Sequence, residues 1–169
     1  MENMIPAEIV TETWQRMSQL DVAEAPILVE QMQQEQPAIL AHLTVLDDFP
    51  FNPHEKGLIF YLGTVVWQIM KQSQRRLRKV TLRKLEKADA AAYEALEMMI
   101  SDSEADFVSA TVAMIENYPE PEVLRYIVEA IMDENEYDPD DPPIRDEYRG
   151  LAFIHLKIAL DAMIASLAR

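Results

Sequence analysis

Two stretches of this chain resemble each other, and each ends in a long run of apolar residues. Both start with a proline and a short apolar segment, and both continue through an acidic break that contains further prolines. They align without a gap at Gly57 with Gly150, Leu58 with Leu151, Phe60 with Phe153, and Met70 with Met163. A repeated unit constrains the architecture before any other feature does. We therefore expect an internal duplication, with halves at about residues 22–75 and 104–168.

Each apolar run is long enough to be a helix. The first run follows residues 52–55 (Asn-Pro-His-Glu), which predict a capped helix start with proline at the first helical position. This helix should extend to about residue 70, and the second should cover about residues 145–167. Both are apolar on nearly every side, and such helices belong in the interior of a bundle. We expect the two to pack together at the centre.

The composition favours helix over sheet. The chain of 169 residues has only three glycines and is rich in alanine, leucine, glutamate and methionine. It has no cysteine, which excludes disulfides, thiolate metal sites and a cysteine nucleophile. A chain of this length can bury a core without such staples. We predict one all-α domain over residues 1–169, a compact bundle of six to eight helices with a helix at 82–100 bridging the halves.

Apolar residues at helical spacing predict two further buried faces. A first helix should begin near Pro6 and bury Val10, Trp14 and Met17. The stripe of the bridging helix should begin at Leu82.

The chain carries a net charge of −15, which disfavours nonspecific binding to nucleic acid or to anionic lipid. Its longest apolar segment contains His155, Lys157 and Asp161, and such charges argue against a membrane span. The first residues include an acid where a secretory signal would carry a base. We expect a cytoplasmic protein without membrane contact.

The basic residues gather in one segment. Residues 71–87 contain one acid and carry a net charge of +7, so the rest of the chain carries −22. The basic residues are Lys71, Arg75, Arg76, Arg78, Lys79, Arg83, Lys84 and Lys87. We expect the segment to continue the helix of residues 53–70, and the sequence leaves open whether that helix breaks near Val80 and Thr81.

The first seven of these basic residues are the candidate contacts for a protein partner or a second copy of the chain. Opposite charges on one surface favour a homodimer in which the basic segment meets an acidic loop. Phosphate contacts to nucleic acid are the alternative, but the arginines lack aromatic neighbours and lie in no known nucleic-acid motif. The simplest interpretation is a solvated helix face, or a surface that neutralises acids of the chain itself or of a second copy.

An acidic loop offers candidate metal ligands. Counted from Glu136, carboxylates fall at the spacing of a helix–loop–helix calcium site, which makes Asp138, Asp140 and Glu147 the candidates. However, Asp141 stands where the sharp turn of such a loop needs glycine, and a proline removes a backbone amide. The alternative is a solvated loop that caps the last helix.

Catalytic motifs are incomplete. Glu94 and Glu97 form a Glu-x-x-Glu pair similar to that of helical Mg²⁺-dependent nucleotide pyrophosphohydrolases, but no partner Glu-x-x-Asp follows. No histidine has a second ligand at metal-binding spacing, so we expect His155 to be a hydrogen-bonded core imidazole. Lys157 and Asp161 should form an ion pair along one helix.

These observations favour a non-catalytic cytoplasmic interaction or regulatory module that binds a protein partner or itself and needs no cofactor. Two alternatives stay open. One is a divalent-metal-dependent hydrolase or ligand-binding bundle that uses helix and loop carboxylates. The other is nucleic-acid binding through residues 71–87.

Overall fold

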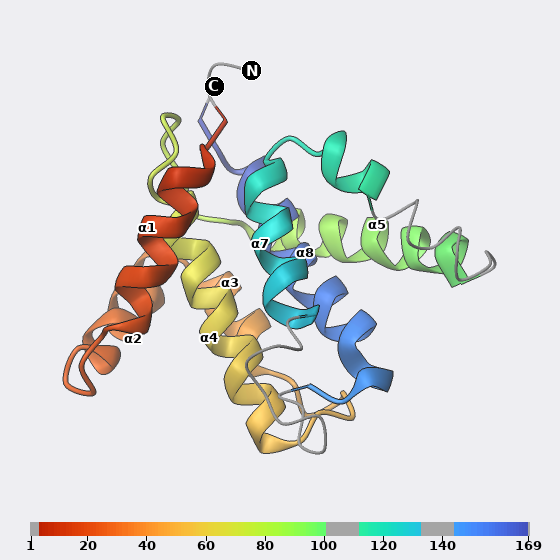
Figure 1. Ribbon diagram of the computed structural model, residues 1–169, viewed down its shortest axis with the longest axis horizontal. Helices are drawn as coiled ribbons and strands as arrows, with labels where there is room; N and C mark the ends of the chain where they lie inside the picture. Colours follow the sequence, from red (N-terminus) through yellow and green to blue (C-terminus); the bar gives the residue numbers. More distant parts are fainter. Residues whose placement is uncertain (1–3, 101–111, 133–143, 169) are drawn as a thin grey trace.

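The computed structural model describes residues 4–100, 112–132 and 144–168, and its regular structure is helical (Figure 1). The predicted all-α class is therefore confirmed. The elements are α1 (Ala7–Ser18), α2 (Ala25–Glu35), α3 (Pro37–Thr44), α4 (Pro53–Met70), α5 (Leu82–Ile100), α7 (Pro121–Met132), the 3-10 turn η1 (Asp146–Tyr148) and α8 (Arg149–Ala165). Within the described ranges, the only β pairing is an isolated bridge between Leu77 and Leu167. No helix there combines the length and apolar character needed to cross a lipid bilayer.

Helices α4 and α8 pack against each other at the centre of the bundle (Figure 1). Both contact α3 and α7, while α1 packs on α4 and α5 packs on α8. Their inner side chains are fully buried, as at Trp67 on α4 and Leu160 on α8. The expectation that the two apolar runs are buried neighbours is confirmed. Helix α5 occupies the range expected for the bridging helix, and the internal duplication stays a prediction.

Two residues of the expected apolar stripes lie outside the core. Trp14 on α1 is 38% exposed and Leu82 at the start of α5 is 63% exposed. On α1 the buried position belongs to Thr13, whose hydroxyl donates to the Ile9 carbonyl at 2.6 Å and accepts from the Gln72 side chain. Thr13 and Trp14 lie three and four residues after Val10, and both positions fall on its side of a helix, so spacing alone does not decide which of the two is buried.

Glu55 joins the chain before α8 to the start of α4. Its carboxylate accepts the Asn52 N–H at 2.8 Å, and Asn52 Oδ1 accepts the Glu55 N–H at 2.8 Å, which confirms the expected cap. The same carboxylate accepts the Arg145 backbone N–H at 2.8 Å and two guanidinium bonds at 2.7 and 3.1 Å. Burial favours the protonated carboxyl, but the bonds from Arg145 and Asn52 outweigh it and hold the pKa of Glu55 below its usual value.

His42 on α3 and His155 on α8 form a reciprocal pair. Each Nε2 lies 2.8 or 2.7 Å from the backbone carbonyl of the other histidine, so each Nε2 carries a hydrogen. The rings stack with centroids 3.9 Å apart, and the Phe49 ring lies edge-on to His155 at 5.3 Å. Burial lowers the pKa of both imidazoles, and burial together with the charge of His42 lowers that of His155 to about 4. The expectation of a hydrogen-bonded core imidazole is confirmed.

The expected ion pair on α8 is also confirmed, with Lys157 Nζ 2.8 Å from Asp161 Oδ2. The Tyr118 hydroxyl donates to the other oxygen of Asp161, and the Lys157 ammonium lies 5.5 Å from the centroid of the Tyr118 ring. Burial and the nearby carboxylate raise the pKa of Tyr118, so the phenol keeps its proton and continues to donate. These contacts tie the segment before α7 to the central helix.

We predict that Glu55→Ala lowers the free energy of unfolding by about 2–3 kcal/mol, because it removes one half of the capping box and the acceptor for Arg145. Urea denaturation measures the loss. Asp47→Ala is the control: it breaks an exposed pair, 3.3 Å from Lys56 Nζ, and should leave the midpoint unchanged. Similar losses in the two variants would contradict the role given to Glu55.

A pair of glycine substitutions tests the approach of α3 to α4. A Cβ at Gly63 would overlap the fully buried side chain of Leu43, whereas a Cβ at Gly57 would have nothing within 4 Å. Gly63→Ala should therefore destabilise the protein by about 1–3 kcal/mol through overpacking. Gly57→Ala should stabilise it by up to about 1 kcal/mol through helix propensity. Thermal melts show whether each variant is less or more stable than the parent chain. A Gly63→Ala variant that is more stable would refute the close contact.

The histidine pair predicts a loss of stability in mild acid. Because folding lowers both pKa values below the unfolded value of about 6.5, the unfolded chain binds more protons, and stability falls from about pH 6.5 towards pH 4. The contribution of His155 to this fall should be about 2–3 kcal/mol. Urea unfolding across this pH range should show a smaller fall for His155→Gln than for the parent chain. A His54→Gln control should follow the parent chain, and indistinguishable curves for all three proteins would exclude the effect.

Candidate functional site

The basic segment does not continue α4, contrary to the sequence-based expectation. Helix α4 ends at Met70, and residues 71–81 form a turn followed by extended chain. A helix here would place Lys71, Arg75 and Lys79 four residues apart on one face, where like charges repel. The β-branched Val80 and Thr81 also have modest helix propensity. The helix therefore ends about ten residues before Val80 and Thr81, where the sequence suggested a possible break.

The extended part of this segment is fixed against the end of α8. The Arg78 N–H donates to the Ser166 carbonyl at 3.0 Å, and the Ala168 N–H donates to the Arg76 carbonyl at 2.8 Å. These are the bonds of a short antiparallel pairing between segments far apart in the sequence. Figure 1 shows the loop after α4 beside the end of α8, near the C-terminus.

Gln36, between α2 and α3, fixes the same segment from the other side. Its side-chain amide donates to the Arg78 carbonyl at 2.9 Å, and its side-chain oxygen accepts the Val80 N–H at 2.9 Å. Gln36 and Val80 are both 2% exposed. Buried amide contacts of this kind position the backbone, because breaking them leaves polar groups without partners. Sequence reasoning missed Gln36, and no local pattern marks it.

A hollow of about 550 Å³ opens beside this backbone. It is lined by Glu35, Gln36, Lys71, Arg76, Leu77, Arg78 and Lys79. Lys71 Nζ lies 3.3 Å from Glu35 Oε1 and 4.7 Å from the centroid of the Trp67 ring, so this cation is already engaged. The structure therefore brings together four of the seven predicted contact residues.

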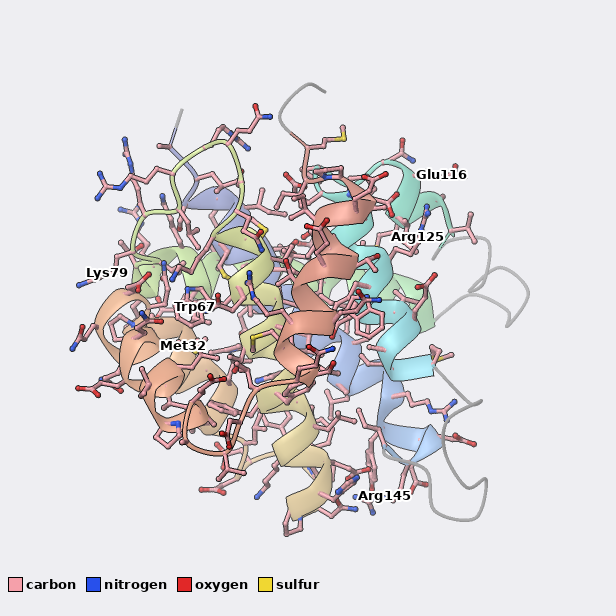
Figure 2. All side chains as sticks on the ribbon, turned by 60° about the vertical axis from the view of Figure 1, so that its left-hand side comes forward. Met32, Trp67, Lys79, Glu116, Arg125 and Arg145 are labelled. Carbon is pink, nitrogen blue, oxygen red and sulfur yellow. The ribbon has the colours of Figure 1, made fainter. Side chains whose placement is uncertain are left out.

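Three of the four positive side chains of the hollow lack acidic partners in the described ranges. Arg76, Arg78 and Lys79 are exposed, and no acid of the described ranges forms an ion pair with them. In Figure 2 Lys79 points outward on the side of the molecule opposite Glu116 and Arg125. The backbone of the hollow is fixed, while its charges face solvent.

The other three predicted contacts have different surroundings. Arg75 is half-buried, and its positive charge opposes the rise in the pKa of Glu120 that burial causes. Lys84 donates to the Ala165 carbonyl at 3.0 Å, where a cation stabilises the C-terminal end of α8. Arg83 is exposed in the first turn of α5. We refer to Lys71, Arg75, Arg76, Arg78, Lys79, Arg83 and Lys84 as the basic surface.

The carboxylates considered for metal binding are not brought together in the part of the chain that the structure describes. Asp138 and Asp140 lie outside the described residues, and Glu147 is exposed in η1. Glu94 is exposed on α5, and the side chain of Glu97 also lies outside the description. Among the described side chains, no group of three histidines or acids could hold a metal ion.

The described residues that line the hollow are mainly cationic. Their only acid, Glu35, pairs with Lys71. Arginine and lysine side chains on a fixed backbone are suited to hold the oxygens of an anion. Comparison with protein-family models, curated proteins and solved structures finds no significant match to this chain.

Proposed function

We propose that this chain is a non-catalytic helical interaction module that binds an acidic protein surface through the basic surface. The proposal depends on a backbone that is fixed by hydrogen bonds and carries cationic side chains without acidic partners in the described ranges. Hydrogen bonds with Gln36 and Ser166 hold residues 76–80, while Arg76, Arg78 and Lys79 face solvent. A surface that needs little rearrangement binds its partner at a small cost in conformational free energy.

The charge distribution favours a second copy of the chain as the partner. The segment 71–87 carries +7 and the rest of the chain carries −22, so each copy offers both signs. A two-fold contact could then place the basic surface of each copy against acidic residues of the other. The acidic composition and the lack of cysteine favour a cytoplasmic location. The described residues add no observation in favour of metal-dependent hydrolysis.

Self-association should depend on salt. Screening acts over about 30 Å at roughly 0.01 M salt and about 3 Å at roughly 1 M, so the dimer should form at low salt and dissociate at high salt. Multi-angle light scattering across this range measures the mass. A monomer at every salt concentration would remove the second copy as the partner.

A matched pair of charge reversals locates the contact. Arg78→Glu should weaken association by at least about fivefold, because it sets like charges against each other across the interface. Arg125→Glu makes the same change in net charge on the side of the molecule opposite Lys79 (Figure 2) and should have little effect. Equal weakening by both variants would mean that net charge, and not the basic surface, controls association.

A further inference from the structure

We infer that the hollow beside Arg76, Arg78 and Lys79 is a binding site for a phosphomonoester, the doubly charged group of phosphorylated side chains and small phosphorylated metabolites. The inference goes beyond the proposed function, because it assigns a ligand to the hollow itself, whereas the proposed partner contact uses the whole basic surface. The volume of about 550 Å³ falls within the roughly 300–1,000 Å³ of small-molecule sites. A phosphate and the atoms that carry it therefore fit.

The net positive charge of the hollow favours a ligand that carries more than one negative charge. Four cationic residues line it with one acid, and that acid is held by Lys71 at 3.3 Å. Three cations are left without an acidic partner in the described ranges. A single carboxylate would neutralise only one of them. A phosphomonoester carries about −1.5 to −2 at pH 7 and presents three acceptor oxygens.

The types of side chain also match phosphate. Arg76 and Arg78 each offer a planar guanidinium that can donate two parallel hydrogen bonds to oxygens of the same group. Lys79 adds a compact charge that can approach from a different direction. Two guanidinium groups and one ammonium group fit a tetrahedral phosphate better than they fit the flat carboxylate of an acidic side chain.

The backbone that carries these side chains is already in place. The Arg78 N–H and carbonyl are bound to Ser166 and Gln36, and the Arg76 carbonyl is bound to the Ala168 N–H. Binding therefore has to order only the ends of the side chains, which keeps the entropic cost of binding small. The rest of this acidic protein contributes little repulsion at physiological salt, because screening acts over about 8 Å.

Nuclear magnetic resonance titration of the full chain tests the inference with three probes. They are inorganic phosphate, a short acidic peptide with one phosphoserine, and the same peptide with glutamate in its place. We expect phosphate and the phosphopeptide to shift the backbone amide signals of residues 76–80. The phosphopeptide should bind about tenfold tighter than the glutamate peptide, because it brings a second charge and a third acceptor.

Three variants locate the site. Arg78→Ala should weaken binding of the phosphopeptide by about tenfold. Arg78→Lys keeps the charge but loses the paired donors of the guanidinium, so it should also weaken binding. Arg83→Ala removes a cation of the basic surface that does not line the hollow, and it should change the affinity by less than about twofold. Circular dichroism melts confirm that each variant folds.

The outcomes separate this inference from the proposed function. Equal affinity for the two peptides would overturn phosphate recognition and leave an acidic partner supported. Shifts with inorganic phosphate but with neither peptide would support the site and identify a small metabolite as the source of the group. Absence of any shift at residues 76–80 would overturn the inference, while the light-scattering result would still decide self-association. A phosphopeptide affinity that is unchanged in Arg78→Ala would place the site elsewhere.

Discussion

The burial of α4 and α8 against each other is the constraint on which the other elements depend. A helix that is apolar on nearly every side is stable in water only if each side is covered. The two helices share α3 and α7 as neighbours, and α1 and α5 complete the cover. A fully buried side chain such as that of Leu160 contributes about 1.5–3 kcal/mol, so this arrangement outweighs weaker local preferences.

Polar contacts then fix how the helices are placed along and around one another. Apolar contact alone allows helices to slide, whereas buried hydrogen bonds are satisfied at one position only. Glu55 ties the chain before α8 to the start of α4, and the pair of His42 and His155 joins α3 to the middle of α8. Both contacts use charged or titratable groups, which makes the packing of the core depend on pH.

The conformation of the basic segment depends on the same packing. Its like charges disfavour a helix, and the end of α8 together with Gln36 offers its backbone alternative hydrogen-bond partners. The positive side chains are thereby gathered at one hollow on a strongly acidic protein. Such a local reversal of charge is a feature that an acidic surface or a phosphate group can recognise.

The sequence by itself determined the class of fold, the two buried helices, the cap at Asn52 and the pair of Lys157 and Asp161. These features depend on periodicity and on contacts within about four residues, which a sequence displays directly. Only the tertiary structure decided that α4 stops at Met70, and that Gln36 shapes the hollow. The local charges only disfavour a longer helix. The hydrogen bonds that hold the chain after it come from Ser166 and Gln36, whose position no local pattern records.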